Sequence, residues 1–158
     1  MHPTMIGYKF NQYYGHMEFY KLTTANEKHN GYQFKTGLNV DTKKFNPYGE
    51  CTAGGIYFTR LEHVLHWIQY RNKTMAKIRK VSIPDNAEVC FEKHKLKANE
   101  IILGEPIDLQ TFLESDKLTT EICLRSVTVD GLLLKYIPLN KLTTEICLAA
   151  VEQNGLAV

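Results

Sequence analysis

Two histidines, His63 and His66, have the spacing in this chain that most directly suggests metal chemistry. They lie one helical turn apart, so in a helix both imidazoles would face the same side and could share a zinc-type ion. The sequence offers no evident third ligand, and the four cysteines include no Cys-x-x-Cys pair that could chelate a metal. We therefore expect no metal site, a solvated helix face for the two histidines, and reduced thiols for the cysteines.

A second chemical possibility is a phosphate-binding patch built from lysines. The residues concerned are Lys73, Lys77, Lys80, Lys93, Lys95 and Lys97. They would gather on one surface if the strands predicted at 78–83 and 88–92 paired with each other. Acidic residues at positions 85, 88, 92 and 100 interrupt the set, and the net charge is only +2. The charge pattern therefore argues against nucleic acid as a partner.

The composition is that of an ordinary soluble domain. Of the 158 residues, 44% are hydrophobic and 23% are charged, close to the average for globular proteins. No apolar run approaches the ~20 residues needed to span a bilayer, and the first four residues, Met-His-Pro-Thr, lack the apolar core of a secretory signal. We expect a cytoplasmic protein with no membrane partner.

The elements that must position any site divide the chain into three parts. Residues 1–16 are rich in aromatic and polar side chains without clear periodicity, and we interpret them as an arm that docks onto the body or onto a partner. Residues 17–105 carry strand signals on both sides of one helix, which Thr59 is placed to cap. The apolar stripe of that helix consists of Leu61, Val64, Leu65 and Ile68. This order predicts an α+β module with a small mixed or antiparallel sheet and one main helix.

Residues 106–158 form a helical region built on a sequence repeat. The segment Lys-Leu-Thr-Thr-Glu-Ile-Cys-Leu at 117–124 recurs at 141–148, a period of 24 residues. Self-similarity at a period of this size is typical of stacked repeats, in which one unit cannot bury its apolar face alone. The second copy stops within its own second segment, so the region contains less than two full units. We therefore expect residues 117–158 to bind a protein partner or a second copy of the chain.

Each copy of the repeat should fold into a short α-helical hairpin. Thr119 or Thr143 can cap the first helix, because a threonine oxygen accepts a hydrogen bond from a free backbone N–H of the first turn. Gly131 or Gly155 stands where a helix commonly ends in a left-handed conformation. A second, shorter helix should follow the glycine.

Three stretches of the sequence, residues 142–157, 29–41 and 54–59, are similar to segments of known proteins. Residues 142–157, Leu-Thr-Thr-Glu-Ile-Cys-Leu-Ala-Ala-Val-Glu-Gln-Asn-Gly-Leu-Ala, are similar to short helical repeats that recur in mimivirus-like giant viruses of amoebae. The motif at 29–41, His-Asn-Gly-Tyr-Gln-Phe-Lys-Thr-Gly-Leu-Asn-Val-Asp, and Gly-Gly-Ile-Tyr-Phe-Thr at 54–59 are similar to a module of unknown function in the same viruses. This resemblance implies a viral protein, in the host cytoplasm or the virion, whose repeat tail contacts other proteins.

A weaker resemblance connects the body with the ADP-ribosyltransferase fold, in which a His-Gly strand, a Gly-Ile-Tyr-Phe strand and a glutamate on a late strand surround NAD. Carried over to this chain, the resemblance implies that His29, with Gly31 beside it, holds the nicotinamide ribose and that Tyr57 stacks on the nicotinamide ring. Glu100 would stabilise the positive charge that develops as the glycosidic bond breaks. The alternative interpretation is a turn histidine, a core aromatic and an exposed acid at a strand end, in a protein that uses no cofactor. Whether the chain is an enzyme stays open at this point.

Overall fold

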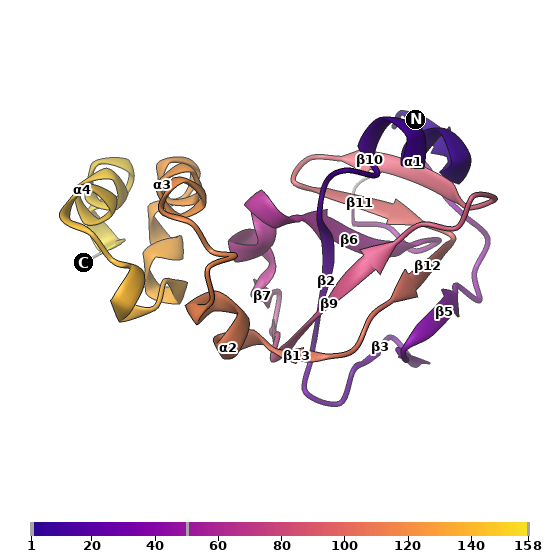
Figure 1. Cartoon of the computed structure of the whole chain (residues 1–158), viewed down its shortest axis with the longest axis horizontal. Helices are drawn as coiled ribbons and strands as arrows, with labels where there is room; N and C mark the ends of the chain where they lie inside the picture. Colours follow the sequence, from indigo (N-terminus) through magenta and orange to yellow (C-terminus); the bar gives the residue numbers. More distant parts are fainter. Residues whose placement is uncertain (1, 50, 158) are drawn as a thin grey trace.

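The computed structural model describes residues 2–49 and 51–157. Its main feature is a nine-stranded antiparallel sheet with the strand order β1-β10-β11-β6-β2-β9-β12-β5, in which β13 pairs with β9 outside this path (Figure 1). The strands are β1 (Thr4–Ile6), β2 (Phe19–Thr23), β5 (Gly37–Val40), β6 (Ile56–Arg60), β9 (Lys77–Ser82), β10 (Glu88–Glu92), β11 (Lys95–Ala98), β12 (Glu100–Leu103) and β13 (Ile107–Asp108). The mixed content agrees with the α+β class, but the sheet is larger than the small one predicted.

Two short hairpins stand apart from the main sheet. β3 (Lys28–His29) pairs with β4 (Tyr32–Gln33), and β7 (Gln69–Tyr70) pairs with β8 (Lys73–Thr74). Asn30 and Gly31 form the loop of the first hairpin, with φ angles of 51° and 83°. Both residue types tolerate the left-handed region that a two-residue hairpin loop requires, so this turn is specified locally.

The first 16 residues, which showed no periodicity, form strand β1 and helix α1 (Gly7–Tyr14). β1 extends the sheet by pairing with β10. Phe10 on α1 is only 1% exposed and packs against Phe19 and Phe58, with ring centroids 5.1 and 6.4 Å away. The segment is too short for a periodic signal, and strand pairing with β10 together with the buried Phe10 attaches it to the body.

The predicted main helix is a 3₁₀-helix, η1 (Leu61–Trp67), and it begins later than expected. Thr59 lies in β6 and its hydroxyl donates to the carbonyl oxygen of His94, so the predicted N-cap was wrong. The predicted apolar stripe faces the core, because Val64, Leu65 and Ile68 are at most 4% exposed.

The C-terminal helices project from one side of the sheet (Figure 1). They are α2 (Leu109–Glu114), α3 (Thr120–Val129), η2 (Gly131–Tyr136), η3 (Leu139–Lys141), α4 (Thr144–Gln153) and η4 (Gly155–Ala157). The predicted threonine caps are confirmed, since Thr119 accepts from the N–H of Ile122 and Thr143 from that of Ile146. In the described part of the chain, every helix is too short or too polar to cross a bilayer.

Two details of the predicted repeat differ from the structure. The second segment of each copy, η2 or η4, is a 3₁₀-helix and not an α-helix. Gly131 and Gly155 are absent from the residues with positive φ, so neither ends a helix in the left-handed conformation. Asp130 and Asn154 instead accept hydrogen bonds from the N–H two residues later and so start the 3₁₀ turns.

The central strands β2 and β9 separate two hydrophobic cores. Their register partners Phe19 and Val81 face the core that the sheet forms with α1. Leu22 and Ile78, also partners, face a second core that continues without a break through η1, α2, α3 and α4. This second core crosses residue 105, so the repeat region and the sheet share one apolar interior.

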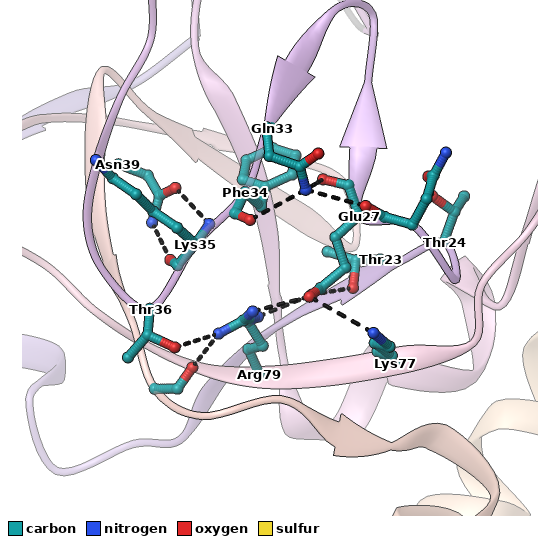
Figure 2. Close-up of polar contacts among 12 residues, drawn as sticks. Thr23, Thr24, Glu27, Gln33, Phe34, Lys35, Thr36, Asn39, Lys77 and Arg79 are labelled. Carbon is teal, nitrogen blue, oxygen red and sulfur yellow. Dashed lines mark hydrogen bonds and ion pairs between the residues drawn. The ribbon is translucent and has the colours of Figure 1, made fainter.

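A buried ion pair fixes the β3–β4 hairpin on the sheet (Figure 2). Arg79 donates from Nε and Nη2 to the two carboxylate oxygens of Glu27, both at 2.8 Å, and from Nη1 to Thr36 and to the carbonyl of Gly104. Thr23 donates a further hydrogen bond to Glu27. The side chains of the pair are 5% and 7% exposed. The hydrogen bonds from Arg79 hold the pKa of Glu27 below its usual range.

Replacing Arg79 with methionine should strongly destabilise the fold. The Glu27 carboxylate would stay buried with only Lys77, whose partly exposed ammonium group lies 3.9 Å away, as a counter-ion. Breaking a buried ion pair by removing one partner typically costs about 3–5 kcal/mol. We expect urea unfolding at pH 7 to show this loss, and the double variant Glu27→Gln/Arg79→Met to recover part of it, because no charge is then left unpaired. A single variant as stable as the double variant would contradict a structural role for the pair.

The same pair predicts an acid-sensitive contribution to stability. Since the pKa of Glu27 is lower in the folded state, its contribution is complete above the unfolded-state pKa of about 4.3 and disappears as the pH falls through the lower, folded-state value. Urea unfolding between pH 6 and pH 3 should therefore show a steeper loss of stability in the wild type than in Glu27→Gln.

Candidate functional site

A cavity of about 620 Å³ opens over β2 and β6, between the two short hairpins. We call it the groove, and it is lined by residues 20–22, 29–32, 34, 41–43, 51–59, 67, 70, 71, 73, 75 and 95. Its volume lies within the range of small-molecule sites. The groove is the candidate ligand site of the body.

Two glycines shape the wall where the chain enters β6. Gly54 and Gly55 have φ angles of 97° and 137°, which favour glycine. A Cβ on Gly55 would lie only 2.9 Å from the side chain of Lys97. The N–H of Gly55 donates to Asp41 over 2.6 Å. The Gly-Gly pair therefore lets the loop before β6 pass close to the lysines of β11.

The groove contains three of the four residues suggested by the ADP-ribosyltransferase resemblance. His29, Gly31 and Tyr57 line it, whereas Glu100 does not. Glu100 lies at the start of β12 opposite Val40, and β2 and β9 stand between β12 and β6 in the sheet. The predicted carboxylate is therefore not placed beside the predicted ring.

His29 and Tyr57, the two groove residues with predicted side-chain roles, both form hydrogen bonds within the chain. His29 accepts a hydrogen bond from the N–H of Thr24, and burial, helped by Lys21 and Lys73, lowers its pKa to about 4. Tyr57 accepts from the N–H and donates to the carbonyl of Thr52. Burial, followed by the charge of Glu92, raises the pKa of Tyr57. His29 is thus a neutral acceptor and Tyr57 a protonated phenol at neutral pH.

Buried lysines dominate the electrostatics of the groove. Lys21 is 7% exposed, and its ammonium group donates to the carbonyl of Tyr57 over 2.7 Å and lies 4.6 Å from the ring centre of Phe34. Burial, with repulsion from Lys95, lowers the pKa of Lys21 to about 7. Among the described residues no carboxylate lies within salt-bridge distance of Lys21. Its charge is therefore uncompensated.

Lys95 and Cys51 form a close polar contact in the groove. The Lys95 ammonium lies 2.7 Å from the Cys51 sulfur and 4.0 Å from the ring centre of Tyr57, and Trp67 and Tyr70 complete an aromatic enclosure. Burial alone would raise the pKa of the Cys51 thiol, but the hydrogen bonds with Lys95 and Tyr70 outweigh it, so this pKa is lowered. The arrangement favours a thiolate paired with an ammonium ion.

Sequence reasoning missed this pair. Lys95 was considered only as part of a phosphate-binding patch, which required the strands predicted at 78–83 and 88–92 to pair with each other. They do not pair: β9 pairs with β2, β12 and β13, and β10 pairs with β1 and β11. The alternation Lys95-Leu96-Lys97-Ala98 was the available signal, since it places both lysines on one face of a strand. Nothing local connects that strand with Cys51.

His63 and His66 are joined by a third histidine, His94, which the sequence did not place beside them. The rings of His66 and His94 stack in parallel with centroids 4.6 Å apart, and those of His63 and His94 are 4.7 Å apart. No set of three or more metal-ligating side chains with suitable geometry occurs within residues 2–49 and 51–157. Burial lowers the pKa of all three imidazoles. The cluster is a packed contact between η1 and the β10–β11 turn.

A second candidate site is the outer surface of α4 and η4, which we call the trailing face. It consists of Cys147, Leu148, Val151, Gly155 and Leu156. Each position has an equivalent 24 residues earlier. Cys123 and Val127 are fully buried, whereas Cys147 is half-buried and Val151 is 38% exposed. The apolar character is the same in both copies, but only the first copy is covered.

The two equivalent glycines show the same difference. A Cβ on Gly131 would collide with the carbonyl oxygen of Ala150 on α4, and the N–H of Gly131 donates to Gln153 over 2.6 Å. A Cβ on Gly155 would meet no atom within 4 Å. Glycine is therefore needed in the first copy for close approach of the following helix, and in the second copy this approach surface is open.

Comparison with known proteins gives relatives of one origin. The chain is 32% identical over 110 residues to R868 of Acanthamoeba polyphaga mimivirus, covering 65% of this chain and 50% of R868. It is 33% identical over 96 residues to R896, covering 57% of this chain and 28% of R896, and 33% identical over 93 residues to R869, covering 55% and 64%. R868 and R896 are named as ankyrin repeat proteins, and R869 is uncharacterised.

These comparisons confirm the resemblance to giant-virus proteins. The chain spans between about a quarter and two thirds of the length of these curated relatives. No family model and no solved structure matches the chain. The comparisons give no support to the ADP-ribosyltransferase resemblance.

The two glycines form a matched pair for mutation. Gly131→Ala should lower the free energy of unfolding by about 1–3 kcal/mol, since α4 must move to admit the methyl group. Gly155→Ala should change it by no more than about 0.5 kcal/mol, because its surroundings are open. Urea unfolding of both variants measures the difference. Equal effects would show that the two copies do not differ in packing.

Proposed function

We propose that this chain is a protein-interaction module whose trailing face binds a partner protein. The observation that carries the proposal is the difference in burial between equivalent positions of the two copies: Val127 is 0% exposed and Val151 is 38% exposed. In repeat proteins each unit is stabilised by the neighbour that covers it. The trailing face has the residues for such a neighbour, and a partner supplies the contact.

The shape of the trailing face favours a helical partner. In the first copy the equivalent surface receives α4, whose backbone approaches Gly131 closely and whose Gln153 bonds to the N–H of that glycine. In the second copy a Cβ on Gly155 would meet no atom within 4 Å, and Leu148 and Leu156 are 59% and 82% exposed. A partner helix would reproduce the contact that α4 makes with Gly131 if it carried an alanine or glycine at the position equivalent to Ala150 and a glutamine or asparagine at the position equivalent to Gln153.

The relatives support the same class of function. Two of them are named for ankyrin repeats, and repeat arrays present extended surfaces to other proteins. The 24-residue period of this chain is shorter than the ~33 residues of an ankyrin repeat. The proposal therefore depends on the exposed stacking surface and not on the ankyrin name.

A second copy of the chain is a less suitable partner in a head-to-tail arrangement. Such a contact would require the leading surface of α3, which packs against η1 and η2 within the same chain. Two copies could meet only through their trailing faces, as a two-fold dimer. Sedimentation or light scattering distinguishes this dimer from binding of another protein.

Val151→Glu should abolish partner binding while the chain stays folded. A carboxylate at the centre of an apolar contact must be desolvated, and we expect captured partner to fall at least 10-fold. The matched control is Ile102→Glu, because Ile102 is 39% exposed on the sheet and Val151 is 38% exposed. Tagged chains expressed in amoebae, followed by crosslinking and quantitative mass spectrometry, measure the capture.

Two further chains complete this experiment. A chain with residues 135–158 appended once more, with Val151→Glu in the added copy only, should melt at a higher temperature and lose partner capture, because the added copy covers the trailing face and its own outer face is charged. A chain ending at residue 138 that also carries Val127→Glu should neither capture a partner nor self-associate, because the truncation alone would uncover the equivalent apolar face of the first copy. Unchanged assembly of the shortened chain would refute the proposed role of the tail.

A second candidate function is NAD-dependent ADP-ribosyl transfer, favoured by the position of His29, Gly31 and Tyr57 on one cavity. If NAD binds the groove, it must stabilise the folded state, by about 2.7 kcal/mol at 100 times its dissociation constant. We expect millimolar NAD to raise the melting temperature of the wild type and not of Tyr57→Ala. A wild type that melts unchanged at all NAD concentrations would exclude this function.

A further inference from the structure

We propose that Cys51 is a nucleophilic thiolate at the mouth of the groove, and that it forms a covalent bond with a small electrophile that carries a carboxylate or phosphate group. This covalent site is independent of the trailing face. It rests on the Cys51–Lys95 contact, on the buried charge beside it, and on the excess of cations along the groove.

The first argument is the geometry of the Cys51–Lys95 pair. The sulfur and the ammonium nitrogen are 2.7 Å apart. Lys95 is 7% exposed, so solvent screens its charge less than it would at the surface. Cys51 is exposed, so its sulfur can attack a molecule in solution. The aromatic rings of Tyr57 and Trp67 hold the ammonium group in place. A thiolate with a buried partner and an exposed sulfur is the arrangement of a reactive cysteine.

The second argument is an incompletely paired carboxylate beside this cysteine. The side chain of Glu92 is 1% exposed, and its Oε2 has no hydrogen-bond partner among the described residues. The closest cation is Lys97, whose ammonium lies 3.9 Å from that oxygen. Glu92 Oε1 accepts from the N–H of Cys51 over 3.4 Å. A buried carboxylate without complete pairing therefore lies beside the backbone of Cys51, just outside the lining of the groove, and a purely structural core avoids such a group.

The third argument identifies the charge of the ligand. Lys21, Lys43, Arg71 and Lys73 line the groove, and Asp41 is the one carboxylate among the described lining residues. Asp41 already accepts from the N–H of Gly55. Lys21 is 7% exposed, and among the described residues no carboxylate lies within salt-bridge distance of it. An anionic group on the electrophile would therefore be drawn toward these cations while its reactive atom stays near Cys51.

Iodoacetate is a probe that has both required features. The thiolate sulfur attacks the methylene carbon, the sulfur–carbon bond forms as the carbon–iodine bond breaks, and iodide leaves with the bonding electrons. Lys95 keeps its proton throughout, because the sulfur is already deprotonated. Iodoacetamide reacts by the same step but carries no charge. The ratio of the iodoacetate rate to the iodoacetamide rate therefore measures electrostatic attraction of the anion by the cations of the groove. The intrinsic reactivity of the thiol affects both rates and cancels in the ratio.

The experiment measures alkylation of each cysteine in the full chain by mass spectrometry between pH 5.5 and 9. At pH 7 we expect Cys51 to react at least 10-fold faster than the half-buried Cys147. The rate at Cys51 should stay high below pH 8, where an ordinary thiol with a pKa near 8.5 slows. Lys95→Met should reduce the rate at pH 7 about 10-fold with both reagents, and Lys95→Arg should restore most of it.

Lys73→Glu should lower the iodoacetate-to-iodoacetamide ratio at Cys51 at least threefold, and Lys80→Glu, on an exposed position of β9 outside the groove, should not. Circular dichroism confirms that each variant is folded. If Lys95→Met does not fold, the pH profile of the wild type still decides the reactivity of Cys51. The proposal is overturned if Cys51 reacts no faster than Cys147 at pH 7, or if Lys73→Glu leaves the ratio unchanged.

Discussion

The pairing of β2 with β9 is the constraint on which the rest of the structure depends. The two strands run antiparallel in register from Phe19 opposite Val81 to Thr23 opposite Lys77, and every residue of β2 is buried. The pairing places two cations, Lys21 and Arg79, directly opposite each other, an arrangement that is unfavourable unless each charge is compensated. Glu27 neutralises Arg79. Lys21 receives only a carbonyl oxygen and an aromatic ring, so this strand pair places one cation without a carboxylate partner in the groove.

The same pairing determines the direction of the tail. The other face of β2 and β9 presents Leu22 and Ile78 to a core that continues through η1 and α2 to α4. The first repeat copy is therefore covered on both sides, by the body and by the second copy. The second copy is covered on one side. Among residues 2–49 and 51–157, the tail therefore packs against the sheet at one end, and no element covers the outer surface of α4 at the other end, at the left of Figure 1.

Sequence reasoning was correct where the signal is local. The caps at Thr119 and Thr143 involve an N–H three residues away, and the buried stripe of η1 follows from side-chain spacing alone. It failed where the cause is distant. The Cys51–Lys95 contact joins residues 44 positions apart. Helix η1 begins only at Leu61, because β6 continues to Arg60 to pair with Phe19. Glu100 was placed on a late strand correctly, but no local pattern shows which strands lie between β12 and β6.

The repeat acts as an internal control for this distinction. Residues 117–124 and 141–148 are identical, so local propensity is the same in both copies, and both fold into a capped helix followed by a 3₁₀ segment. The difference in burial between Cys123 and Cys147, which lie in the identical segment, therefore comes from tertiary context. Packing within the chain accounts for glycine at 131, because α4 occupies the space that a Cβ would fill. It does not account for glycine at 155 or valine at 151. A surface that keeps the shape and apolar character of a buried one, without a neighbour among the described residues, is what a binding face for another helix requires.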